Sequence, residues 1–210
     1  MPASPYPMAA YTFLGLDTPC LGRYFYKVKF KTQMISQSSK AIQKLKDSGI
    51  IVFPVARNSN YLKANFVTVD PITYNDIVLL LPIKKQLVWL DLSQKNIPDS
   101  LLTPIGQLTN LTRLQLDNTS ITDKGLVSLQ SLVNLQYLNL VGTKVTTHGV
   151  IQLKALPKLQ ALYLYKTFIS SSDWPMLKNN FPKVTLDTGG YQVPFLETDT
   201  MIVKPPVKKS

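Results

Sequence analysis

The sequence predicts an α/β solenoid, in which short parallel strands lie on one side of a stack of repeats and helices lie on the other. Two observations support this expectation. A block of 24 residues recurs in four frames that begin at Leu87, Leu111, Leu135 and Leu159, and a fixed period of this length is typical of repeat architectures. Each frame opens with the pattern L-x-x-L-x-L, which indicates a strand with one buried face.

The strand positions that would face the core are all leucine. When the four frames are aligned, three inward columns hold twelve residues: Leu87, Leu111, Leu135 and Leu159; Leu90, Leu114, Leu138 and Leu162; and Leu92, Leu116, Leu140 and Leu164. We expect these side chains to form the core of the strand layer and to have no other role.

A threonine follows the last strand leucine by three residues in three of the frames, at Thr119, Thr143 and Thr167, with Lys95 in the first frame. A hydroxyl at a fixed place in a tight turn commonly bonds to the nearby backbone. We therefore expect the threonines to form a structural ladder.

The second half of each frame predicts a helix. In the second frame Thr122-Asp123 can supply N-cap oxygens just before the apolar positions Leu126, Leu129 and Leu132. Equivalent apolar positions follow in the other frames, although the fourth frame drifts by one residue near Phe181. A drifting last unit is typical of a terminal repeat.

These residues resemble the leucine-rich repeat in the form LxxLxLxxTxITDxGLxxLxxLxN. The resemblance implies a leucine-rich-repeat solenoid, a short arc with parallel strands on the concave face, helices on the convex face and an irregular N-terminal cap. More narrowly, SNYLKANFVTVD followed by LLLPIKKQLVWLDLSQ is similar to part of certain large bacterial membrane-associated proteins, in which the repeats follow a c-type cytochrome domain. The haem-attachment pattern CxxCH is absent, so no haem function is implied for this chain.

The sequence divides into four segments. Residues 1–36 have no predicted place. Residues 37–86 predict N-terminal capping units, with a helix over SSKAIQKLKDSG, an edge strand at IIVFPVA, a strand at YLKANFVTVD and a helix at TYNDIVLLLPIKKQ. Residues 87–186 hold the repeats and a last half-strand, and residues 187–210 form a tail that we expect to be extended or loose.

The charge is strongly basic, with 23 Lys and Arg against 12 Asp and Glu, a formal net charge of +11. Eight of the basic residues precede Asn60: Arg23, Lys27, Lys29, Lys31, Lys40, Lys44, Lys46 and Arg57. A basic balance permits attraction to nucleic acid or anionic surfaces without specifying either. Binding of such a partner through the basic N-terminal third is therefore the alternative function.

The compartment and the oligomeric state are not indicated. Cys20 is the only cysteine, so the chain has no internal disulfide that would mark an oxidising compartment. The opening residues are a poor signal peptide, and no apolar run is long enough for a transmembrane segment. The sequence thus favours the cytoplasm by default, or a periplasmic or membrane-associated location if the chain is a piece of a larger protein.

No constellation in the sequence predicts catalysis, a cofactor or a bound metal. His148 is the only histidine and stands where a convex helix should start, and one Cys with one His cannot build a zinc site. Asp187-Thr188-Gly189 matches the DTG of aspartic proteases, but only one copy is present, and we interpret it as a turn. We expect the protein not to be an enzyme.

The outward strand positions predict a binding face. In a parallel sheet they form columns about 4.8 Å apart, and the candidate partner-binding residues are Trp89, Asp91, Arg113, Gln115, Tyr137, Asn139, Tyr163 and Tyr165. An arginine between two aromatic rings can stack on both, which contributes about 0.5–2 kcal/mol.

Trp, Tyr and Arg also dominate interface hot spots, so we expect a protein partner. A glycan is a weaker third possibility. Aromatic side chains also pack across strands for stability alone, and that interpretation remains open.

Overall fold

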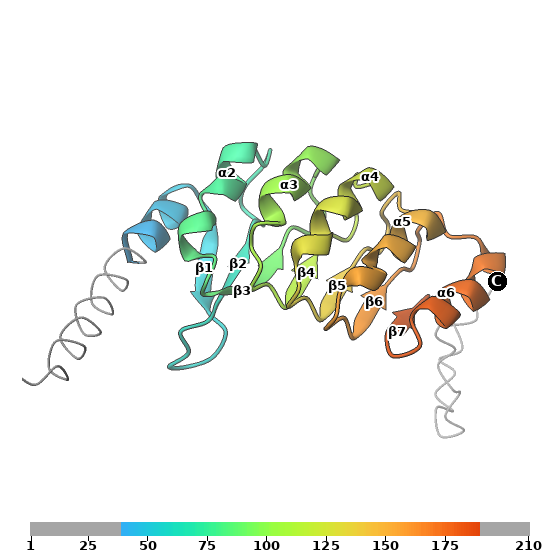
Figure 1. The fold of residues 1–210 in the computed structure, drawn as a ribbon. Coiled ribbons are helices and arrows are strands. Elements are labelled where there is room, and N and C mark those ends of the chain that lie inside the picture. Colours follow the sequence, from blue (N-terminus) through green and yellow to red (C-terminus); the bar gives the residue numbers. More distant parts are fainter. Residues whose placement is uncertain (1–38, 190–210) are drawn as a thin grey trace, which may run out of the picture. The chain divides into compact units, whose positions relative to one another are not determined.

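The structure is a computed structural model that describes residues 39–189. The chain divides into two units, Met1–Lys40 and Ala41–Ser210, and of the first unit only Ser39 and Lys40 are described. In the second unit one seven-stranded sheet runs in chain order from β1 to β7. Helices α2 to α6 lie on one side of this sheet (Figure 1). We call the other side, which no helix of the described part covers, the open face.

The sheet begins with two strands that precede the leucine frames. A helix over residues 39–47 is followed by a turn that contains Gly49, whose φ of 81° suits the left-handed position after a helix. Strand β1 (Ile51–Pro54) is the edge strand and pairs antiparallel with β2 (Leu62–Asn65). Helix α2 (Tyr74–Val78) and a 3₁₀ turn (Leu81–Ile83) then lead to β3 (Leu87–Asp91), which is parallel to β2.

The remaining strands are parallel and follow the 24-residue period. They are β4 (Arg113–Gln115), β5 (Tyr137–Asn139), β6 (Ala161–Tyr163) and β7 (Thr185–Asp187). The pairing register joins Leu90, Leu114, Leu138, Leu162 and Leu186 in one row. The alignment of the frames in the sequence is therefore the register of the sheet.

The helices of the repeats are short and mix α and 3₁₀ geometry. They are a 3₁₀ turn (Asp99–Leu101) with α3 (Leu102–Ile105), α4 (Asp123–Leu126) with a 3₁₀ helix (Val127–Ser131), α5 (Thr147–Gln152) with a 3₁₀ turn (Leu153–Ala155), and a 3₁₀ turn (Ser171–Asp173) with α6 (Trp174–Asn180). A 24-residue unit that already contains a strand and two turns leaves room for only these few turns of helix.

The predicted core is confirmed. All twelve column leucines are buried, and the most exposed of them, Leu159, is 7% exposed. The threonine ladder is also present, because the hydroxyls of Thr119 and Thr143 donate to the carbonyl oxygens of Leu116 and Leu140 at 2.6 Å. Strand, ladder turn and helix recur in each unit, so the fold is the α/β leucine-rich-repeat solenoid that the sequence predicts.

The two residues expected to cap α4 have different roles. Thr122 is the N-cap and its hydroxyl accepts from the Lys124 N–H at 3.3 Å. The Asp123 carboxylate instead reaches the next repeat, where it accepts from Thr146 N at 2.7 Å and from Thr146 Oγ1 at 2.6 Å. Asp99 binds Thr122 in the same way. Each carboxylate thus accepts two charge-assisted hydrogen bonds from a threonine of the following repeat and links the two repeats.

The described residues end just after β7. Gly189 has a φ of 69°, and its N–H donates to Asp187 Oδ1 at 2.9 Å. Asp187 is the last residue of β7, and its side chain bonds to the backbone two residues on, so only this side-chain contact matches the turn expected from the sequence. The rest of the predicted tail lies outside the described residues. Within residues 39–189, no helix has the length and apolar character needed to cross a membrane.

Candidate protein-binding face

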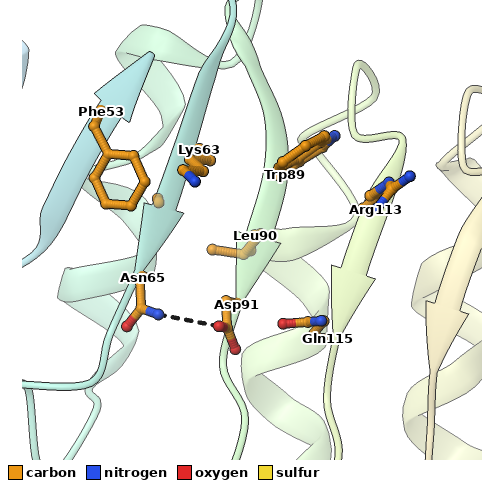
Figure 2. A pocket seen from close by; sticks show the side chains of 9 residues that line it. Phe53, Lys63, Asn65, Trp89, Leu90, Asp91, Arg113 and Gln115 are labelled. Atoms are coloured by element: carbon orange, nitrogen blue, oxygen red, sulfur yellow. Dashed lines mark hydrogen bonds between the residues drawn. The ribbon is translucent and has the colours of Figure 1, made fainter. Parts of the chain in front are cut away.

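Aromatic and cationic side chains alternate in one row across the open face. The strand register places Phe53, Lys63, Trp89, Arg113 and Tyr137 on successive strands from β1 to β5. Figure 2 shows the first four of these side chains side by side. We call these five residues the aromatic–cationic row.

Each cation of the row lies within cation–π distance of two rings. Lys63 Nζ is 4.3 Å from the centre of the Phe53 ring and 5.7 Å from that of Trp89. Arg113 Cζ is 4.8 Å from the Trp89 ring and 4.4 Å from the Tyr137 ring. Such contacts are worth about 0.5–1 kcal/mol where the cation remains exposed, as Arg113 does. Their main effect here is to fix the direction of the guanidinium.

The two cations have no anionic partner in the part of the chain that the structure describes. The Lys63 ammonium and the Arg113 guanidinium make ring contacts, but neither makes a hydrogen bond or an ion pair with residues 39–189. The N–H groups of Arg113 therefore have no hydrogen-bond acceptor within the described part of the chain and are available to a partner.

A polar network lies below this row and occupies the nearby carboxylates. Asp91 accepts from Asn65 Nδ2 at 3.0 Å and from the Ser93 N–H at 3.1 Å. The Ser93 hydroxyl lies 2.6 Å from Asp91 Oδ1 and 2.7 Å from Asp117 Oδ1, so it is shared between them. Asp117 also accepts from Asn139 Nδ2 at 3.1 Å. The two carboxylates are therefore stabilised within the sheet itself.

Two small hollows adjoin each other on this face. The first has a volume of about 230 Å³ and is lined by Phe53, Lys63, Ala64, Asn65, Trp89, Leu90, Asp91, Arg113 and Gln115. The second has a volume of about 280 Å³ and is lined by Arg113, Leu114, Gln115, Tyr137, Asn139 and Tyr163. Pockets for drug-sized ligands are usually about 300–1,000 Å³, so each hollow is suited to one or two side chains of a partner.

Seven of the eight residues predicted from the sequence line these hollows, and Tyr165 does not. Tyr165 follows β6 and is 45% exposed. Its ring lies where a side chain on Gly189 would be, so it packs on the last turn and not toward Arg113. Ala161 pairs with Tyr137 on the next strand and so continues the line of Trp89, Arg113 and Tyr137. It is only 7% exposed and offers little surface.

Sequence reasoning missed Phe53 and Lys63. Phe53 lies on an antiparallel strand that is no part of the repeat. Lys63 pairs with Trp89 at an offset of 26 residues, because the register between β2 and β3 shifts at Leu62/Lys63. Counting back 24 residues from Trp89 gives Asn65, which instead pairs with Asp91. The only sequence signal for Lys63 was the alternation of polar and apolar residues in β2, which has four residues. That is too short to set the register of the strand.

The residues of the other interpretations lie outside the described part of the chain or away from the two hollows. Arg23, Lys27, Lys29 and Lys31 of the basic N-terminal third, together with Cys20, lie outside the described residues. His148 is exposed at the start of α5. Residues 39–189 contain no group of three His, Cys, Asp or Glu side chains placed to hold a metal ion.

No family model matches this chain, and no curated protein matches it. Solved structures with a similar fold include an internalin of Listeria monocytogenes, with a TM-score of 0.45 and 23% identity over 55% of this chain and 32% of that one. A leucine-rich-repeat protein of Leptospira interrogans has a TM-score of 0.39 and 27% identity, over 51% of this chain and 27% of that one. Internalin C2 of Listeria monocytogenes has a TM-score of 0.38 and 24% identity, over 52% of this chain and 55% of that one.

The structural neighbours are leucine-rich-repeat proteins. The match spans between 27% and 55% of their own length. All three TM-scores lie below 0.5, so the function has to be inferred from the residues of this chain.

Proposed function

We propose that this chain is a non-catalytic leucine-rich-repeat module that recognises another protein through the open face of strands β1 to β5. The observation that carries the proposal is Arg113, stacked between Trp89 and Tyr137 where the two hollows meet. Binding energy at protein interfaces concentrates in Trp, Tyr and Arg residues that lie at the centre of the contact.

A purely structural role is the competing explanation. Aromatic residues on neighbouring strands stabilise a sheet by about 0.2–1 kcal/mol for each cross-strand pair. If the aromatic–cationic row acts only in this way, its removal lowers stability slightly and leaves binding unchanged. A binding role gives the opposite pattern, so the two explanations are separable by experiment.

The experiment compares capture of proteins from a lysate of the source cells by the full chain and by its variants. Trp89→Ala and Tyr137→Ala are each expected to weaken capture of the specific partner by about 2 kcal/mol, or roughly 30-fold. Val127→Ala is the matched control, because Val127 is 52% exposed on the helix side. Thermal unfolding of each variant checks that the fold is kept. If Trp89→Ala and Tyr137→Ala capture the same proteins as the unmodified chain, the row is structural and the proposal fails.

Salt and charge variants distinguish the nucleic-acid alternative. Binding through the row should weaken only modestly between low and physiological salt. Binding of nucleic acid through the N-terminal third should instead fall steeply, as counterions are released. In that case replacing Lys27, Lys29 and Lys31 by Gln would abolish binding, and the row variants would have no effect.

The wider setting is also part of the proposal. The resemblance described above implies that such a module acts within a larger membrane-associated assembly. Sequencing the coding region upstream is the direct test. An in-frame cytochrome-type domain with a CxxCH pattern supports it, and an upstream stop codon in the same frame contradicts it.

A further inference from the structure

Resting on the proposed function, we infer that the protein partner anchors itself with a carboxylate, an Asp or Glu side chain that enters the first hollow and binds the N–H edge of Arg113 beside Lys63. The observation behind this inference is the charge state of the hollow. Two cations, Lys63 and Arg113, and one carboxylate, Asp91, line it, and neither cation makes an ion pair among residues 39–189.

Covering these cations without an anion would be unfavourable. A partner that packs on the aromatic–cationic row removes water from Lys63 and Arg113, and a charge that is desolvated without a partner weakens binding. Asp91 lines the same hollow and offsets part of its positive charge, but its carboxylate is bonded to Asn65 and Ser93 and makes no ion pair with either cation. A carboxylate of the partner would supply the direct contact to Arg113 that the described residues do not make.

The geometry of Arg113 selects a planar acceptor. The guanidinium lies within cation–π distance of both Trp89 and Tyr137, and its N–H groups make no hydrogen bond within residues 39–189. Two parallel N–H groups of a guanidinium match the two oxygens of a carboxylate. Lys63 lies two strands away, about 10 Å along the sheet, and is placed to add long-range attraction. Its two ring contacts hold its ammonium on the same hollow.

A carboxylate also fits better than a phosphate. Asp91 lines the same hollow, and a phosphate monoester carries about −1.5 to −2 charges at neutral pH, which strengthens the repulsion from that aspartate. The floor of the hollow includes Ala64 and Leu90, both buried, and it accommodates the methylene groups of an Asp or Glu side chain.

Gln115 provides a second contact for the same segment. It lies two residues after Arg113 on β4 and lines both hollows. Its side chain is exposed and makes no hydrogen bond to the described part of the chain. An amide can donate and accept, so it suits a backbone peptide group of the partner next to the anchoring carboxylate.

The probe is a library of random 12-residue peptides displayed on phage and selected on the full chain. Peptides that bind the unmodified chain but not Trp89→Ala are directed at the row. We expect them to share an Asp or Glu, and a synthetic peptide with Glu→Gln or Asp→Asn at that position should bind at least tenfold more weakly. Arg113→Lys, which keeps the charge and loses the fork, should cause a similar loss. When the peptide with Glu→Gln or Asp→Asn is tested on Arg113→Lys, its affinity should be little lower than with either change alone. The reason is that both changes remove the same contact.

Two further variants serve as controls. Lys63→Gln should weaken binding of the acidic peptide less than Arg113→Lys does, and the exposed Lys124→Gln on α4 should leave it unchanged. Thermal unfolding of each variant confirms that the chain is folded. Binding is read from the fluorescence of Trp89 in a Trp174→Phe background, since these are the two tryptophans of the chain.

The outcomes separate this inference from the proposed function. Row-directed peptides without a shared acidic residue, or with equal binding of the Gln form, overturn the carboxylate anchor and leave the protein-binding role intact. A phosphoserine peptide that binds more tightly than the Glu peptide, in a manner that depends on Arg113, also overturns it. If selection yields no peptide that depends on Trp89, both the anchor and the binding role are wrong.

Discussion

Replacing Leu138 by alanine tests whether the leucine row is one continuous core. Leu138 is 0% exposed, and its row neighbours Leu114 and Leu162 are 1% and 0% exposed. The strands on both sides are held by backbone hydrogen bonds, for example Leu116 N to Asn139 O at 3.0 Å and Leu140 N to Tyr163 O at 2.9 Å. The cavity left by the substitution therefore cannot collapse, and we expect a loss of about 3–5 kcal/mol, the upper part of the usual range.

The matched control is Leu186→Ala in the same row. Leu186 lies on the terminal strand β7 and is only half-buried, because no further described strand lies beyond it. Its truncation should lower the free energy of unfolding by about 1–2 kcal/mol, since less apolar surface is lost and the site is open to solvent. Urea unfolding followed by circular dichroism measures both values, and the thermal midpoint of Leu138→Ala should fall by about 10 °C or more.

The difference between the two variants is the decisive quantity. Equal losses for Leu138→Ala and Leu186→Ala would mean that the centre of the stack is no more tightly packed than its end. A loss below about 1 kcal/mol at Leu138 would also refute the core assignment. Truncating a fully buried leucine with fixed neighbours should lower the free energy of unfolding by more than that.

Two other substitutions test the polar contacts between and within repeats. Thr143→Val keeps the shape and removes the buried hydroxyl that donates to Leu140 O, so the free energy of unfolding should fall by about 1–2 kcal/mol in urea titrations; an unchanged value would contradict the ladder. Gly149→Ala should be destabilising by about 2 kcal/mol, although alanine favours a helix by about 1 kcal/mol, because its Cβ would displace the Asp123 carboxylate from Thr146. In an Asp123→Ala background the same Gly149→Ala change should cost clearly less, because the carboxylate is gone and only the Cβ at position 123, 2.8 Å from the added Cβ, still has to move. A loss of the same size in both backgrounds would show that the carboxylate contact is not the cause.

The repeat and its core could be predicted from the sequence alone. The leucines at the inward positions of the four frames can all be buried only if the frames stack in register, because each unit buries its apolar face against its neighbours. The same period placed Trp89, Arg113 and Tyr137 on adjacent strands, and the structure pairs them in that order. Residues that lie within the regular frames were thus predictable in position, since a constant period converts sequence spacing directly into strand register.

The three-dimensional structure was needed to place residues that lie outside that period and to find contacts between units. Lys63 joins the aromatic–cationic row because the offset between β2 and β3 is 26 residues at that point, and Phe53 joins it from an antiparallel strand. Asp123 binds the next repeat and not its own helix. Spacing in the sequence says nothing about these pairings, because a shift in register or a bond to a neighbouring unit is set by packing between strands and by which donors the neighbour presents.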